Sequence, residues 1–509
     1  MSSDTSNLPN IEPYTIEPIN DDYSVTDGYY SDGIEADYQG SSESKRKLPL
    51  PLPILLALIF GILAILIFLL IALTRKGTGE PVPGDINNGN TNNNQSVQIR
   101  WVGAFLDEDV VNPLIQEYEA LNPNVDIQYF NQWPLDKPFT TAERDYRNEL
   151  NSLFLDPLTS PDIFMVNNTW TQEFLVKAYP SPIISAEAMQ SSYYPAVTTD
   201  FVNGGLVYGV PFWIDTLALV YNEDLLITST NQNINPPDEW PGFRLFAESI
   251  SDFSADNPIA GFAAGNPSNT SFAFELINLL MIQNNVQIST VDGVPVFAND
   301  SDVLSTFNFY KSFLSSPKTW ESSFSYDATG FSEGRVAMVL ATSWRYKDIL
   351  RANDQFNLGL NIGIKDIPQL EDQSVPLLNW ATYWGSMVNK ESFYPEESWA
   401  FLEWMSRPEQ LQKLYKNQEE KDGYFGFLYA RSDMANLIEN DEYFSVYVDS
   451  LPSAFSWKIP KGIETRDLFF NTLSGSITSA SIQTLQDDIK LLWEGVAAER
   501  LGLSAGPQV

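Results

Sequence analysis

An uninterrupted apolar segment, ILLALIFGILAILIFLLIAL, runs from Ile54 to Leu73 and limits how the chain can fold. As a helix it would be about 30 Å long, which matches the hydrocarbon core of a bilayer. We therefore predict one transmembrane helix within residues 48–74. A cleaved signal peptide is the alternative. However, the apolar segment starts late, is long, and is followed by TRKG instead of a small-residue cleavage site.

The segments that flank this helix differ from it in composition. Residues 1–47 are rich in Ser, Asp and Glu and lack apolar periodicity, which predicts a disordered acidic tail. Residues 75–96 include GTGEPVPGDINNGNTNNNQS, whose Gly, Asn and Pro content predicts a flexible linker. Residues 97–509 carry the remaining apolar patterning and are expected to form the folded domain.

Basic residues set the expected orientation in the membrane. The triplet KRK at 45–47 precedes the apolar segment, and the pair RK at 75–76 follows it. Because the more cationic flank usually stays in the cytoplasm, we expect a single-pass protein of the cell membrane with a cytoplasmic N-terminus. Residues 97–509 are then extracellular.

Composition excludes several kinds of chemistry. The chain has no Cys and no His, so thiol nucleophiles, histidine triads and thiolate or imidazole zinc sites are ruled out. Its formal net charge of −37 argues against a nucleic-acid partner, which requires clustered Lys and Arg. We expect no metal and no cofactor, and a neutral or cationic ligand fits this charge better than a polyanion.

Strands and helices alternate in the folded region, which predicts the α/β class. VQIRWVGAF, DEDVVNPLIQEYEALNP and VDIQYFNQW form a strand, helix and strand in succession. PDIFMVN is a further strand, ATGFSEGRVAMVLATSW contains another, and VPVFAND after an Asp-Gly turn predicts a hairpin. Longer helices are expected at Ala273–Asn284, Asp302–Leu314, Glu396–Arg407 and Ile482–Arg500.

A carboxylate interrupts one of the most apolar stretches of the chain. Asp215 lies in GVPFWIDTLALVYNEDLL, two residues after Trp213, with no cation next to it. An ionised Asp in a buried strand costs several kcal/mol unless it is paired. Something outside the strand is therefore expected to satisfy it.

Seven segments, in this order along the chain, resemble one family. They are WVGAFLDEDVVNPLIQEYEALNPNVDIQYF, SPDIFMVNNTW, GLVYGVPFWIDTLALVYNEDLL, PPDEWPGFRLFAESI, FSEGRVAMVLATSWRYKDI, WATYWGSMVNKES and AFSWKIPKG. Together they are similar to the extracellular solute-binding proteins of ABC importers, family 1, in the maltose- and sugar-binding branch. The resemblance implies a two-lobed fold of the periplasmic-binding-protein type II kind, with a ligand cleft between the lobes.

The resemblance also implies which residues bind the ligand. Asp215 would face the cleft and accept hydrogen bonds from ligand hydroxyls, and Trp344 would stack on a sugar ring. The remaining expected ligand-binding residues are Trp170, Asn168, Tyr383, Trp384, Trp457 and Trp213. For each, a structural role stays open: Asp215 paired inside the protein, and the aromatic rings packed in the core. Trp240 is expected in the core.

These observations predict a membrane-anchored receptor that captures a carbohydrate-like solute and delivers it to the membrane subunits of an ABC importer. We do not expect an enzyme, because no pair of carboxylates suited to glycoside cleavage can be named. Two alternatives remain: a ligand sensor or scaffold that signals through the cytosolic tail, and a carbohydrate-cleaving enzyme.

Overall fold

The computed structural model describes residues 96–134, 137–230, 235–370, 376–421, 428–438, 441 and 444–503. The expected acidic tail, the expected transmembrane helix and nearly all of the expected linker lie outside these residues. Within the described part of the chain, no helix is both long enough and apolar enough to cross a bilayer.

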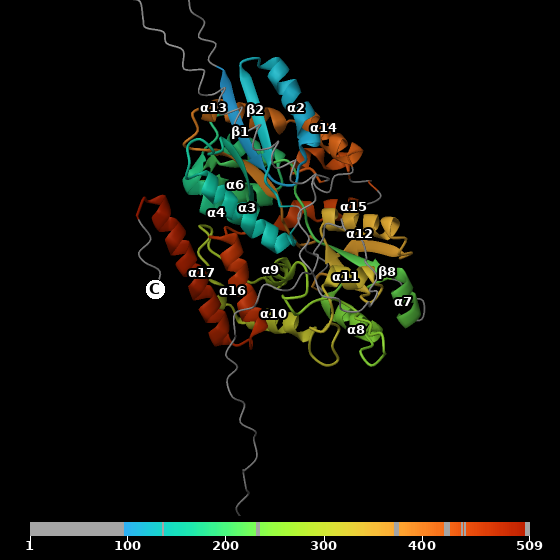
Figure 1. Ribbon diagram of the computed structural model, residues 1–509. Helices are drawn as coiled ribbons and strands as arrows, with labels where there is room; N and C mark the ends of the chain where they lie inside the picture. The colour runs from blue at the N-terminus through green and yellow to red at the C-terminus, as the bar shows by residue number, and fades with distance from the viewer. Residues whose placement is uncertain are drawn as a thin grey trace, which may run out of the picture. The chain divides into compact units, whose positions relative to one another are not determined.

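A six-stranded sheet organises the first lobe (Figure 1). Its strand order is β2-β1-β3-β12-β4, and β7 also pairs with β12. The strands β1, β2 and β3 are parallel to one another, whereas β12 runs antiparallel to β3. The strand bounds are β1 Val97–Gly103, β2 Val125–Asn131, β3 Ile163–Asn167, β4 Ala178–Tyr179, β7 Gly209–Pro211 and β12 Trp384–Asn389.

Helices of the first lobe come from both halves of the chain. Helix α14, from the C-terminal half of the chain, packs against helix α2, from the N-terminal half, and Figure 1 shows the two side by side. The helix bounds are α2 Glu108–Leu121, α3 Phe139–Leu153, α4 Thr171–Phe174, α5 Ala186–Ser192, α6 Pro195–Phe201, α13 Pro395–Met405 and α14 Pro408–Glu420.

A three-stranded antiparallel sheet organises the second lobe, in the order β10-β8-β9. The strands are β8 Ala218–Asn222, β9 Met338–Ala341 and β10 Ile362–Asp366. The helices are α7 Glu223–Thr230, α8 Trp240–Ile250, α9 Ala273–Gln283, α10 Ser301–Ser312, α11 Asp327–Ser332 and α12 Ser343–Gln355. Near the C-terminus follow α15 Ser445–Val448, α16 Gly462–Ser474 and α17 Ser479–Arg500, and α16 packs on α17.

Residues of β8 and β9 alternate between two hydrophobic clusters. Ala218 and Val220 belong to the cluster that includes the first lobe, whereas Leu219 belongs to the cluster of the second lobe. Successive side chains of a strand point to opposite faces, so this sheet is covered by apolar groups on both sides. That explains why the sequence reads as an almost unbroken apolar run here.

The chain passes between the lobes at three places. Residues 212–217 lead from β7 to β8, residues 381–383 lead from β11 (Asn379–Trp380) to β12, and a third segment follows β13 (Ala454–Phe455), which pairs with β11. The first two segments are bonded to each other: Asp215 N donates to Thr382 O at 3.0 Å, and Thr382 N donates to Asp215 O at 2.9 Å.

The structure confirms most of the expected elements and corrects one. The strand, helix and strand at the start are β1, α2 and β2, and the four long helices are present with ends shifted by at most a few residues. The hairpin expected at VPVFAND is much shorter than predicted. A turn does form at Thr290–Gly293, but only an isolated bridge joins Ser289 to Pro295, and Phe297–Asn299 is a 3-10 helix.

Candidate functional site

A cavity of about 660 Å³ opens between the two lobes. Its walls come from α3 and the segments between lobes on one side, and from the loop at 267–272, α9 and the start of α12 on the other. The start of α16 completes the lining. Because segments distant in sequence meet here, the cavity exists only in the folded protein.

Two aromatic rings in the lining of this cavity stack on each other. Phe139 is the first residue of α3, directly after Pro138, and Trp344 lies in the first turn of α12. Their ring centroids are 5.6 Å apart with an angle of 14° between the planes, which is a stacked arrangement. Phe272 meets Trp344 edge-on at 6.5 Å. Trp344 is only half-buried, so part of its ring surface remains available.

The loop that carries Phe272 is held by buried polar groups. Ser271 donates to the Asp327 carboxylate from its backbone N at 2.7 Å and from its hydroxyl at 2.8 Å. Phe272 itself has a φ of 56°, in the left-handed region that non-glycine residues rarely adopt. The bonds to Asp327 therefore hold the loop where this unfavourable backbone conformation places the Phe272 ring against Trp344.

Asp215 lines the cavity, but its carboxylate is bonded inside the protein. Oδ1 accepts from the backbone N of Thr216 and of Ser343, both at 2.9 Å, and Oδ2 accepts from the Ser343 hydroxyl at 2.6 Å. Ser343 is the first residue of α12, so Asp215 places negative charge at the N-terminus of the helix that carries Trp344. Burial raises the pKa of Asp215 to about 7, although the hydrogen bonds from Ser343 and Thr216 oppose this shift.

A second buried carboxylate, Asp200, is bonded to a residue that lines the cavity. Asp200 accepts hydrogen bonds from the Tyr383 hydroxyl at 2.6 Å, from Ser456 Oγ at 2.9 Å and from Asn168 Nδ2 at 3.0 Å. Burial raises the pKa of Asp200 to about 7 against the effect of these donors. The three donors come from three separate parts of the chain, two of them in or next to the segments between lobes.

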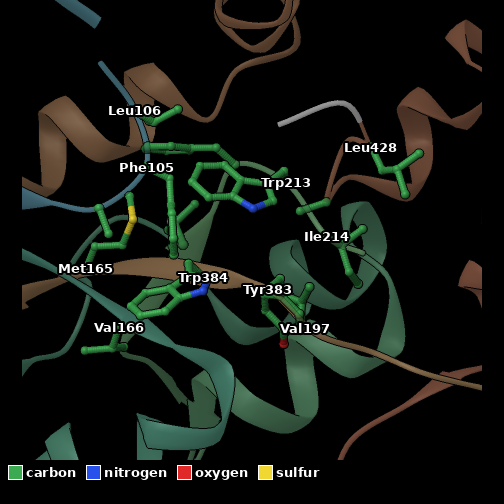
Figure 2. Packing of buried hydrophobic residues seen from close by; sticks show 14 of the residues in the cluster. Phe105, Leu106, Met165, Val166, Val197, Trp213, Ile214, Tyr383, Trp384 and Leu428 are labelled. Atoms are coloured by element: carbon green, nitrogen blue, oxygen red, sulfur yellow. The ribbon is translucent and has the colours of Figure 1, made fainter. Parts of the chain in front are cut away.

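Tyr383 and Trp384 are adjacent in sequence but point in different directions (Figure 2). The Trp384 ring lies 4.9 Å from the ring of Phe105, whereas the Tyr383 hydroxyl points toward α6 near Val197. Trp213 also borders the cavity, and its side chain is buried. The main role of Tyr383 is therefore its hydrogen bond to Asp200. Trp384 and Trp213 form a largely buried apolar wall of the cavity.

The comparison with protein-family models matches residues 113–444 to the family described as bacterial extracellular solute-binding protein. The chain belongs to this family. No curated protein sequence matches the chain.

Solved structures of other solute-binding proteins share the fold. The sugar-binding protein MalE from Xanthomonas citri is 21% identical with a TM-score of 0.59, and the match covers 80% of this chain and 98% of that one. A cyclic α-maltosyl-1,6-maltose binding protein from Arthrobacter globiformis is 16% identical with a TM-score of 0.61, covering 79% and 99%. UgpB from Mycobacterium tuberculosis, in complex with glycerophosphocholine, is 12% identical with a TM-score of 0.60, covering 78% and 99%. These likenesses establish the two-lobed α/β fold.

Five of the eight residues expected to bind ligand border the cavity of this solute-binding protein. They are Asp215, Trp344, Trp213, Tyr383 and Trp384. Their ligand contacts remain predictions.

The other three expected residues do not border this cavity. Trp170 is fully buried, and the start of α16 covers it so closely that a Cβ at Gly462 would lie 2.6 Å from the indole Cδ1. Trp457 is buried in the second lobe and donates to Asn278 at 3.0 Å. Asn168 is buried and bonded to Asp200. Trp240, expected in the core, is confirmed there.

The sequence does not predict the charged residues that line this cavity. Arg466 on α16 forms an ion pair with Glu143 on α3 at 2.6 Å, and Arg144 pairs with Asp467 at 2.5 Å. Glu275 on α9 lies beside the first pair. No local motif marks these residues, because each pair joins positions more than 300 residues apart in the chain.

Proposed function

We propose that this protein captures a carbohydrate in the cavity between its lobes and delivers it to an ABC importer. The observation that carries the proposal is the Phe139 and Trp344 ring pair beside carboxylate, guanidinium and amide groups. Sugars present apolar C–H faces to aromatic rings and hydroxyls to polar groups, so their binding needs both kinds of surface in one cavity. The cavity volume of about 660 Å³ is within the range of small-molecule sites.

Relatives of the same fold support a carbohydrate as the ligand. The structural neighbours from Xanthomonas citri and Arthrobacter globiformis are described as sugar-binding and maltosyl-maltose-binding proteins. The Mycobacterium tuberculosis neighbour holds glycerophosphocholine, so the fold also accommodates a phosphodiester. The aromatic pair is the feature that favours a sugar in this chain.

A ligand screen tests this function. Purified full-length protein is heated with members of a library of oligosaccharides, polyols and glycerophosphodiesters, and its melting temperature is recorded. A ligand present at about 100 times its dissociation constant adds about 2.7 kcal/mol to the free energy of unfolding, so a true ligand raises the melting temperature clearly. We expect an oligosaccharide to do so and to be recovered intact by chromatography. Stabilisation by non-carbohydrates alone contradicts the proposal, and cleavage of the sugar indicates an enzyme.

We propose further that Ile54–Leu73 anchors the protein in the cell membrane with residues 97–509 outside. The support is the length of the apolar segment and the absence of a cleavage site after it. Protease added to intact cells should digest the folded domain and spare an N-terminal tag. Digestion of the tag with survival of the domain shows the opposite orientation.

A further inference from the structure

The charges that line the cavity are almost all paired with each other. Arg466 Nη1 lies 2.6 Å from Glu143 Oε2, and Arg144 Nη2 lies 2.5 Å from Asp467 Oδ1. Asp215 is satisfied by the start of α12, as described above. The charges of these groups are therefore compensated inside the protein, while Arg466 Nη2 has no hydrogen-bond partner among the described residues.

The third cation of the cavity, Arg345, lies near two carboxyl groups. Arg345 follows Trp344 and is buried, with 8% of its surface exposed. Its positive charge acts on two carboxyl groups: it opposes the rise that burial causes in the pKa of Asp327 and of Asp348. Arg345 Nε is buried and has no hydrogen-bond partner among the described residues, so this guanidinium can still donate to an oxygen atom of a ligand.

Glu275 is the exception among the carboxylates. It is the third residue of α9, borders the cavity and is half-buried. In the part of the chain that the structure describes, no other residue donates a hydrogen bond to its side chain and no cation lies within ion-pair distance. Burial raises the pKa of Glu275, and nearby Glu143 adds to that shift, while its own backbone N–H and Arg466 oppose it.

We propose that Glu275 sets the charge preference of the cavity. It accepts hydrogen bonds from a hydroxyl or ammonium group of the ligand and excludes ligands that carry a phosphate or carboxylate at that position. This inference rests on the proposed function, because it concerns the carbohydrate held in the same cavity.

Elementary electrostatics supports this preference. A carboxylate only accepts hydrogen bonds, so it matches O–H and N–H donors and repels another anion. Charges in a partly buried site act at a lower effective dielectric than in water, which strengthens both the attraction and the repulsion. A phosphate or carboxylate here would meet the negative charges of Glu275 and Glu143, while Arg466 and Arg144 are each ion-paired with a carboxylate.

The test measures three trisaccharides of different charge on the full-length protein by calorimetry: maltotriose, the trisaccharide of glucosamine, and trigalacturonate. Wild-type protein should bind a neutral or cationic member about tenfold or more tightly than trigalacturonate. Glu275→Gln should reduce this ratio about tenfold, since it removes the repulsion and one acceptor oxygen. Glu149→Gln, at an exposed position of α3, is the matched control and should keep the wild-type ratio.

Three outcomes overturn the inference. The first outcome is tight binding of trigalacturonate by the wild-type protein. This result needs no variant, so it can overturn the inference even if Glu275→Gln does not fold. An unchanged ratio in a folded Glu275→Gln variant does so as well. If the wild-type protein binds none of the three sugars or any other carbohydrate, the proposed function fails and this inference falls with it, a result distinct from the first two.

Discussion

The tryptophans of this protein differ in how much of each ring the fold covers. Trp344 is half-buried and borders the cavity, with one stacking contact to Phe139. Trp170 and Trp457 are buried among other side chains and have no ring face toward the cavity. Only a partly uncovered ring can gain contact area from a ligand, so the three residues should respond differently to substitution.

We predict that Trp344→Ala lowers carbohydrate affinity ten- to hundredfold, about 1 to 3 kcal/mol, because stacking and apolar contact are lost. The melting temperature without ligand should change little. Trp457→Ala is the matched control. It removes a core ring and should cost about 3 to 5 kcal/mol of folding free energy. Calorimetry and melting curves on both variants check this. Normal binding by a strongly destabilised Trp344→Ala protein contradicts the placement of the site.

The first turn of helix α12 is held in place by Asp215, a residue 128 positions earlier in the chain. Asp215 bonds both the backbone N and the hydroxyl of Ser343, and Trp344 is the next residue. The carboxylate therefore affects the lining of the cavity through the helix that it caps. We infer that Asp215 is a positioning residue, and that ligand hydroxyls are met by other groups of the cavity.

Substitution of Asp215 tests this role. Asp215→Ala leaves buried donors of Thr216 and Ser343 without an acceptor, so we expect a loss of about 2 to 3 kcal/mol in the free energy of unfolding. Asp215→Asn keeps one oxygen and should lose about 1 kcal/mol, mainly the favourable charge at the helix N-terminus. Urea unfolding and calorimetry measure both quantities. In a positioning role, losses of affinity and stability run in parallel. A large loss of affinity at unchanged stability in Asp215→Asn indicates direct contact with the ligand.

The hydrogen bonds of Asp200 join segments that connect the two lobes. Tyr383 lies where the chain returns to the first lobe, and Ser456 follows β13. The folded-state pKa of Asp200, about 7, lies above its ordinary value of 3.8. The folded state thus holds this proton more tightly than the unfolded chain, and the stability that the proton provides is lost as pH rises toward 7.

We predict that Asp200→Asn removes part of this pH dependence. Wild-type protein loses the contribution of Asp200 between pH 5 and pH 7, about 2 to 3 kcal/mol. The variant has no proton to lose there, so the stability difference between wild type and variant should be larger at pH 5 than at pH 8. Denaturant unfolding at both pH values measures this difference. Equal differences at the two pH values show that Asp200 is ionised throughout.

Local pattern and resemblance predicted much of this molecule, and long-range contacts account for the remainder. Alternating strands and helices predict the α/β class, and the family resemblance predicts a position in the cleft for Trp344, which follows β9. Trp170 also follows a strand, yet α16, almost 300 residues later, covers it. Similarly, three helices bring together Glu143, Glu275 and Arg466. Local sequence spacing cannot predict this contact, because the three residues are far apart in the chain.

The stacked rings of Phe139 and Trp344 also make intrinsic tryptophan fluorescence a probe of this cavity. The chain has 13 Trp, and most of the others are buried in environments that a bound solute does not reach. Indole emission changes in wavelength and intensity when water beside the ring is displaced. Because the Trp344 ring borders the cavity and stacks on a residue of the opposite lobe, its fluorescence should respond both to the arrival of a solute and to movement between the lobes. Trp344→Phe identifies which part of the total emission comes from this position, so uptake can be followed in real time without an attached dye.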